Sequence, residues 1–145
     1  MYIDESNEWD AQAGRWVWWC RTRRLFAPPV KSNILARLQP RRGRSVEPDA
    51  FLDAEMPFFN MAVHALCEHP EHAQEAAAFV GVNWYEVNIK LLAHEQQCAR
   101  GTIYNRARRF AQRAHSLAGT IRKVQESMSM LECSTEAEQN TVSVD

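Results

Sequence analysis

Apolar residues recur along the last third of the chain at a spacing that places them on one face of an α-helix. They alternate at intervals of four and three residues: Ile103, Ala107, Phe110, Ala114, Leu117, Ile121, Val124, Met128 and Leu131. We call this set the seam. Because a helix turns once in about 3.6 residues, the seam predicts one helix from about Arg100 to Glu132. Such an apolar stripe must pack on other helices or on another chain.

Helical spacing also dominates the rest of the chain, whose 145 residues suffice for one domain. It predicts helices over residues 8–24, 32–38, 50–67, 71–80 and 83–95. No stretch of useful length alternates as a strand does, so we expect an all-α fold of five or six helices with a helix-turn-helix and a long C-terminal helix.

Proline, glycine and asparagine mark the expected helix ends. Pro57 is tolerated in a first turn, so its helix either begins at Asp53 or kinks at Met56. Gly81 is expected to close the preceding helix as a C-cap, and Asn83 to open the next one.

The domain organisation follows from these elements. Residues 1–132 are expected to form a single helical domain with a helix-turn-helix at about 84–113, and residues 133–145 a disordered acidic tail. A basic connection between Pro40 and Pro48 is the one internal linker.

The net charge of −1 hides a segregation of charge along the chain. Residues 11–44 carry nine basic residues and no acidic one, and residues 100–123 carry seven and none. An ordinary solvated helix mixes both signs. The two basic segments therefore indicate surfaces for nucleic acid or another acidic partner, which the net charge alone argues against.

A helix-turn-helix pattern lies in the second basic segment. Ala93 is small enough for a close helix crossing, Gln96–Ala99 forms a short polar turn, and Ile103 is the apolar residue expected early in the second helix. Gln97 stands where such turns often have glycine. The predicted DNA-binding residues lie off the seam: Arg100, Gly101, Thr102, Tyr104, Asn105, Arg106, Arg108, Arg109 and Arg113. Arginine and asparagine can bind base edges in a major groove, and threonine and tyrosine commonly bind phosphate.

The first basic segment combines arginine with tryptophan. Trp18 and Trp19 lie off the apolar stripe of their helix, where they either complete the core or anchor a partner. The residues predicted to contact nucleic acid or a protein partner here are Arg21, Arg23, Arg24, Arg41, Arg42, Arg44, Trp18 and Trp19.

The later part of the seam, Leu117–Leu131, extends past the helices expected to cover the earlier part. It either packs within the domain or pairs with a second copy as a homodimer.

A metal site and an enzymatic function find little support. His64, Cys67, His69 and His72 offer four ligands, but their spacing matches no standard zinc module and Pro70 separates them. We expect helix-terminal histidines that face water, with no metal and no cofactor. No phosphate loop or nucleophile elbow is present, so we expect no enzyme.

The cysteines and the termini bear on the cellular location. Cys20, Cys67, Cys98 and Cys133 are widely separated, which is typical of a reducing compartment rather than of a disulfide scaffold. No signal peptide or apolar membrane span is evident. We expect a cytoplasmic protein without a membrane partner.

Residues 84–121 resemble a known family. The similarity is carried by Trp84-Tyr85-Glu86-Val87-Asn88-Ile89-Lys90-Leu91-Leu92-Ala93-His94 and Gln97-Cys98-Ala99-Arg100-Gly101-Thr102-Ile103-Tyr104-Asn105-Arg106-Ala107. It resembles the helix-turn-helix of the Q-type late-gene antitermination proteins of lambdoid phages, which is related to sigma factor region 4. The order of the preceding elements from residue 9 is also similar. The chain departs from the family in Pro57, the long C-terminal helix and the acidic tail.

The resemblance implies a function. Such a protein binds double-stranded DNA near a late promoter, engages paused bacterial RNA polymerase and travels with it past terminators in the cytoplasm of the host cell. By analogy Arg100, Thr102, Asn105 and Arg106 would contact DNA, and the Trp-rich helix or the linker would meet polymerase. Two alternatives stay open: a small terminase subunit that oligomerises through residues 117–131 and binds viral DNA, and an adaptor whose basic segments bind an acidic protein.

Overall fold

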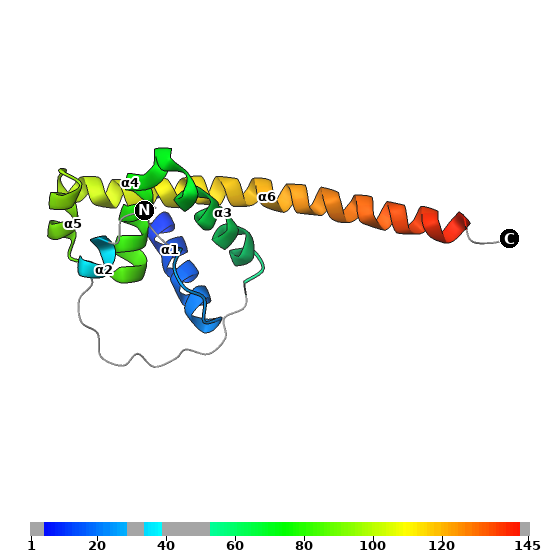
Figure 1. The fold of residues 1–145 in the computed structure, drawn as a ribbon, viewed down its shortest axis with the longest axis horizontal. Coiled ribbons are helices and arrows are strands. Elements are labelled where there is room, and N and C mark those ends of the chain that lie inside the picture. Colours follow the sequence, from blue (N-terminus) through cyan, green and yellow to red (C-terminus); the bar gives the residue numbers. More distant parts are fainter. Residues whose placement is uncertain (1–4, 29–33, 39–52, 143–145) are drawn as a thin grey trace.

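The computed structural model describes residues 5–28, 34–38 and 53–142, and it confirms the all-α fold, with no strand in these ranges. The helices are α1 (Glu5–Thr22), α2 (Ile34–Leu38), α3 (Met56–Glu68), α4 (Ala73–Val80), α5 (Ile89–Glu95) and α6 (Arg100–Val142), with a 3-10 turn η1 (Pro70–His72) and a π-helical turn η2 (Gly81–Tyr85). Figure 1 shows α6 as a long rod: the other helices pack along its first half, and its second half projects beyond them.

The core lies where α1, α3 and α4 meet the first half of α6. Trp16, Phe59, Phe79 and Phe110 are completely or almost completely buried. The ring of Phe79 lies 5.2 Å from that of Trp16 and 4.8 Å from that of Phe110, measured between centroids. The buried indole is also satisfied, since Trp16 Nε1 donates to Asn60 Oδ1 at 3.0 Å. This aromatic packing fixes α6 against the rest of the domain.

Pro57 lies in the first turn of α3, as its tolerance there predicts. The helix begins at Met56 rather than at Asp53, whose carboxylate instead accepts a hydrogen bond from the Glu55 amide at 2.9 Å.

Gly81 is the C-cap residue of α4, as predicted, and its amide donates to the Ala77 and Ala78 carbonyls, but it does not adopt the left-handed conformation typical of a glycine cap. Its backbone is right-handed, with φ of −64°, and the chain continues without a break into η2. A β-carbon at Gly81 would lie 2.9 Å from Leu35 Cδ2 and 3.1 Å from Leu92 Cδ2. Glycine is therefore required here because α2 and α5 approach the backbone closely, not because of a left-handed turn.

The predicted opening of a helix at Asn83 is wrong. Asn83 lies inside η2, and its Nδ2 donates to the Phe79 carbonyl at 2.9 Å. The chain reverses at Glu86, which has a left-handed φ of 49°. Asn88 then caps α5, accepting from the Lys90 amide at 3.0 Å.

The C-terminal helix continues past Glu132, where the sequence predicted it to end, and reaches Val142. In the described part of the chain, no helix is both long enough and apolar enough to cross a bilayer.

Candidate nucleic-acid interface

The turn between α5 and α6 has the geometry of a tight helix C-cap. The Gln97 amide donates to the His94 carbonyl at 3.1 Å, and the Cys98 amide to the Ala93 carbonyl at 2.9 Å. This pair of bonds is a Schellman motif, whose central residue adopts a left-handed conformation. Gln97 does so, with φ of 54°, at the position where such turns often have glycine. The predicted turn at Gln96–Ala99 is thus present.

The two helices of the motif cross on small and apolar side chains. Leu92 and Ala93 of α5 are 2% and 5% exposed, and Ile103 of α6 is completely buried. The α6 backbone begins directly after the turn, with the Thr102 amide donating to the Ala99 carbonyl at 3.0 Å. The first turns of α6 are therefore held against α5 at one end of the molecule.

Arg106, one of the predicted DNA-binding residues, is half-buried and hydrogen-bonded within the fold. Its Nη1 donates to Gln96 Oε1 and lies 3.7 Å from Cys98 Sγ. Gln96 Nε2 in turn donates to the Gln74 carbonyl of α4 at 3.1 Å. Arg106 thus connects α6 to the turn and, through Gln96, to α4.

Two more of the predicted DNA-binding arginines have partners within the fold. Arg108 forms a bidentate ion pair with the Asp10 carboxylate of α1: Nε donates to Oδ1 at 3.3 Å and Nη2 donates to Oδ2 at 3.1 Å. Arg113 Nε lies 3.0 Å from Glu75 Oε2 of α4. These pairs join α6 to its neighbours, and the partial exposure of both arginines leaves them in reach of solvent.

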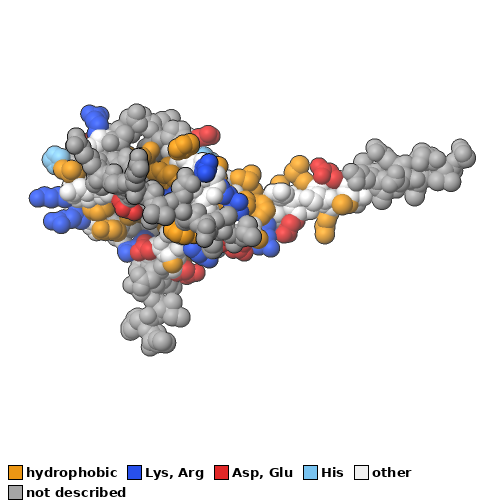
Figure 2. Space-filling view, turned by 90° about the horizontal axis from the view of Figure 1, so that it is seen from below, with side chains coloured by type: hydrophobic (Ala, Val, Ile, Leu, Met, Phe, Trp, Pro, Cys, Tyr) orange, Lys and Arg blue, Asp and Glu red, His pale blue; other side chains and the backbone are white. Residues whose placement is uncertain are grey.

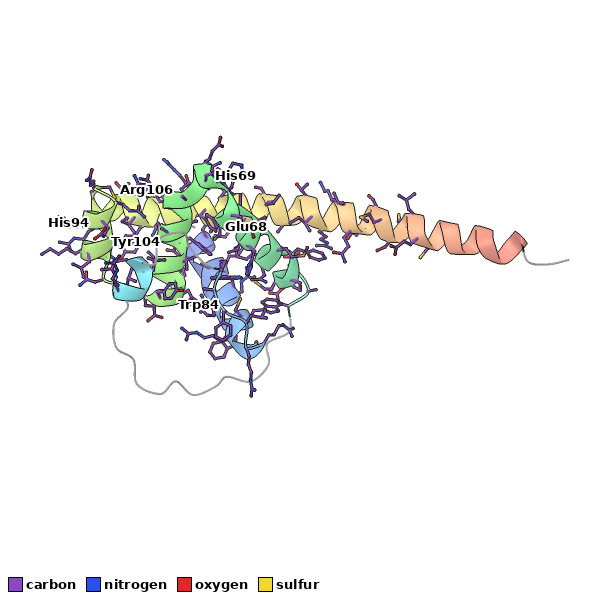
Figure 3. All side chains as sticks on the ribbon, in the orientation of Figure 1. Glu68, His69, Trp84, His94, Tyr104 and Arg106 are labelled. Carbon is purple, nitrogen blue, oxygen red and sulfur yellow. The ribbon has the colours of Figure 1, made fainter. Side chains whose placement is uncertain are left out.

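The remaining predicted residues form an open surface on the first turns of α6. Arg100, Gly101, Tyr104, Asn105 and Arg109 are exposed, and Thr102 is partly exposed. Among the residues that the structure describes, none forms an ion pair with Arg100 or Arg109. Figure 2 shows Lys and Arg side chains at the end of the molecule near α5, and Figure 3 labels Tyr104 and Arg106 at the start of α6.

The structure adds α5 residues that the sequence did not suggest. Lys90, Leu91 and His94 line an open groove of about 550 Å³ together with Cys98 and Arg100. Lys90 was missed because it is the single basic residue in an acidic stretch of sequence, residues 45–99. Its helical register beside the turn is the signal that could have found it.

The first basic segment divides into core and surface. Trp19 is 5% exposed and belongs to the core, so the prediction that it contacts a partner is wrong. Trp18 is 48% exposed, and Phe26, which the sequence did not single out, is 85% exposed.

Two of the described arginines of this segment lie over aromatic rings. The guanidinium of Arg23 lies 4.9 Å from the Trp19 ring centroid, and that of Arg21 lies 5.9 Å from the Trp84 ring. Arg24 is exposed and has a left-handed φ of 56° just after α1. Arg41, Arg42 and Arg44 lie outside the described residues.

The four residues weighed as metal ligands are not brought together. Within the described chain, His69 and His72 cluster with Glu71, their ligand atoms lying within 4.8 Å of one another, while His64 and Cys67 are not part of the group. Cys67 is buried, which raises the pKa of its thiol to about 12, and the nearby Glu68 charge adds to this. A thiol that stays protonated is a poor metal ligand.

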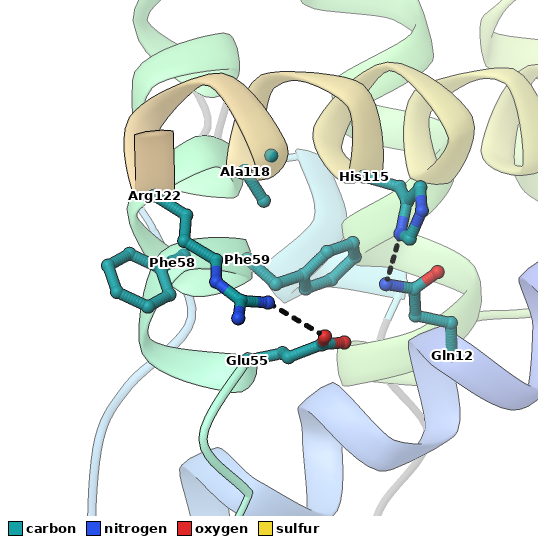
Figure 4. Close-up of a pocket in the computed structure, with 8 residues that line it drawn as sticks. Gln12, Glu55, Phe58, Phe59, His115, Ala118 and Arg122 are labelled. Carbon is teal, nitrogen blue, oxygen red and sulfur yellow. Dashed lines mark hydrogen bonds and ion pairs between the residues drawn. The ribbon is translucent and has the colours of Figure 1, made fainter. Parts of the chain in front are cut away.

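A small pocket of about 180 Å³ lies between α1, α3 and α6 (Figure 4). Its polar groups already bind one another: Gln12 Nε2 lies 3.1 Å from His115 Nδ1, and Arg122 Nη1 donates to Glu55 Oε1 at 3.2 Å. Phe58 and Phe59 supply the apolar wall. The pocket is therefore part of the packing between these helices.

Comparisons of the chain with known protein families, curated proteins and solved structures find no match.

Proposed function

We propose that this protein binds double-stranded DNA by placing the first turns of α6 in a major groove. The observation that carries the proposal is the exposed surface of Arg100, Tyr104, Asn105 and Arg109 on a helix whose start is held by the α5–α6 turn. The absence of acidic residues from position 100 to position 123 supports it, because phosphate repels carboxylates.

We further propose that the bound protein acts on bacterial RNA polymerase as a late-gene antitermination factor. The support is the resemblance of residues 84–121 to the Q-type phage proteins. Trp18, Phe26 and the arginines at the end of α1 form an exposed aromatic and basic surface suited to a second macromolecular contact.

Fluorescence anisotropy with duplex DNA over a salt series tests the DNA contact. We expect Arg109→Ala to weaken binding about tenfold and to reduce the slope of log affinity against log salt by about one unit. Lys123→Ala is the matched control, because it removes the same charge from the same helix about 21 Å further along.

Two outcomes would overturn the DNA contact: no binding by the wild-type protein at low salt, or equal losses in both variants.

For the action on polymerase, transcription in vitro through a terminator is compared with and without the protein, on a template that carries the late promoter of its own genome. We expect the wild-type protein to increase read-through. Variants that have lost DNA binding should give no more read-through than a reaction without the protein.

A second candidate function is a small terminase subunit, which the exposed second half of α6 favours because such subunits bind viral DNA as oligomers. It predicts a ring of eight or more copies in solution. A mass of one or two chains contradicts it, and a ring contradicts the antitermination proposal.

A further inference from the structure

The 3-10 turn η1 brings two histidine rings together between α3 and α4. His69 caps the turn and His72 is its last residue, so the two stand three positions apart. Side chains at this spacing eclipse each other in a 3-10 helix, because one turn takes three residues. The ring centroids accordingly lie 5.2 Å apart, at an interplanar angle of 38°. His69 is exposed and His72 is partly exposed, so both rings are in reach of solvent. Figure 3 labels His69 in this connection.

Glu71 adds a carboxylate to the two rings. One ligand atom from each of His69, Glu71 and His72 lies within 4.8 Å of the other two. Zn²⁺ binds nitrogen and oxygen ligands at about 2.1 Å in a tetrahedral arrangement, in which the ligand atoms are about 3.4 Å apart. The three atoms must therefore approach one another by up to about 1.4 Å, which side chains at the surface can do by rotating.

Both imidazoles can offer a nitrogen lone pair. Glu75 Oε2 lies 3.9 Å from His72 Nδ1. A carboxylate on this side of the ring favours the tautomer that carries its proton on Nδ1, which leaves the Nε2 lone pair for a metal ion. His69 Nδ1 accepts from the Glu71 amide at 3.4 Å, a long distance for a hydrogen bond. A metal ion that binds His69 therefore displaces only a weak contact.

The charges next to the two rings favour a cation. Residues 68–75 include Glu68, Glu71 and Glu75 and no lysine or arginine. Arg113 of α6 lies 3.0 Å from Glu75 and compensates that carboxylate. Within the ranges that the structure describes, Glu68 and Glu71 form no ion pair. A divalent ion beside the rings would therefore meet two uncompensated carboxylates.

We propose that His69, Glu71 and His72 bind a divalent transition-metal ion of the Zn²⁺ class, with water as the remaining ligand. Imidazole nitrogen suits Zn²⁺, whereas Mg²⁺ and Ca²⁺ take oxygen ligands. The set differs from the four ligands that the sequence offers, because Glu71 takes the place of His64 and Cys67. The proposal goes beyond DNA binding and does not depend on it, since none of the three ligands is assigned to DNA.

The ion joins the residue that follows α3 to the residue that precedes α4. Its two histidine ligands stand on either side of Pro70 and Glu71, so binding fixes the connection between the two helices. The folded chain holds the three ligands close together and the unfolded chain does not. Zn²⁺ therefore stabilises the fold, by an amount that rises with the concentration of the ion.

Isothermal titration calorimetry of the full chain with Zn²⁺ tests the site. Cys98 and Cys133 are replaced by Ser, because thiolates outside the core also bind Zn²⁺. We expect about one Zn²⁺ per chain at micromolar concentrations, and His72→Gln should weaken the affinity about tenfold or more. His64→Gln is the matched control, since it removes a partly exposed histidine of α3 that lies outside the group, and it should leave the affinity unchanged.

Thermal denaturation provides a second measurement. Zn²⁺ should raise the midpoint of the chain with His72 and leave that of His72→Gln unchanged. Circular dichroism without metal checks that the variants fold alike.

Three outcomes would overturn the proposal. They are no Zn²⁺ binding at micromolar concentrations, equal weakening by His64→Gln and His72→Gln, and an affinity for Mg²⁺ equal to that for Zn²⁺. The last would show that the carboxylates alone hold the ion, without the histidines.

Discussion

Residues 103–118 and residues 119–133 of α6 share one apolar spacing but lie in different surroundings. In the first stretch the seam is buried under α1, α3, α4 and α5, and in the second it is largely exposed (Figure 1). Periodicity therefore predicts which face of a helix is apolar, whereas the burial of that face depends on how far the neighbouring helices extend along it. The arginines do not follow this division. Arg106, Arg108 and Arg113 of the first stretch bind partners in the turn or in other helices, whereas Arg109 of the same stretch is exposed. Arg122 of the second stretch pairs with Glu55, just before α3.

The largest difference between the two stretches is expected for a charge placed on the seam. Ile103→Asp buries a carboxylate at a completely enclosed position, so we expect the free energy of unfolding to fall by about 4 kcal/mol or more. Val124→Asp, at a half-exposed position, should cost less than about 0.5 kcal/mol in dilute protein. Chemical denaturation followed by circular dichroism measures both.

Protein concentration provides the control. If Val124 is buried only between two copies, the cost of Val124→Asp grows as the protein is concentrated, because association stabilises the wild type by mass action. A loss for Val124→Asp in dilute protein as large as that for Ile103→Asp would mean that the two stretches do not differ as the structure shows.

The local pattern of the helix-turn-helix could be predicted from the sequence because it depends on neighbouring residues. The start of α6 at Arg100, the turn at Gln96–Ala99 and the crossing of Ala93 with Ile103 all follow from spacing within about twenty residues.

The errors arose where tertiary contacts override local preference. Gly81 stands at the C-cap of α4 as the sequence predicts, but the close approach of Leu35, which requires glycine there, could not be predicted from local sequence. The ion pair of Arg108 with Asp10 could not be predicted either, because Asp10 lies 98 residues away in the sequence. No spacing rule connects such pairs, so the division of the arginines into bracing and open groups needed the fold.

An intermediate effect is expected for Arg106→Ala. It removes a donor from Gln96 and loosens the turn, and we expect a loss of about 1–3 kcal/mol in unfolding free energy. Arg109→Ala, at an exposed position without an ion pair among the described residues, should change stability by less than about 0.5 kcal/mol. Thermal denaturation of the two variants, beside their DNA affinities, separates an arginine that positions the motif from one that contacts DNA.

The salt dependence of binding sharpens this distinction. A positioning residue should weaken DNA binding without changing the salt slope, whereas a phosphate contact should reduce the slope by about one. A reduced slope with unchanged stability in Arg106→Ala would show that Arg106 leaves Gln96 and binds DNA directly.

The smallest effect is expected for Arg122→Ala, at the boundary between the two stretches. Arg122 donates at 3.2 Å to Glu55 of α3 and at 3.2 Å to Glu126 of α6. All three side chains are at least half exposed, so solvent screens both pairs and we expect a loss of about 0.5 kcal/mol or less, vanishing near 1 M salt. Arg122→Lys should retain part of the effect. A loss above about 2 kcal/mol that persists in salt would mean that the contact between Arg122 and Glu55 fastens α3 to the projecting stretch, which would then belong to the packed domain rather than stand apart from it.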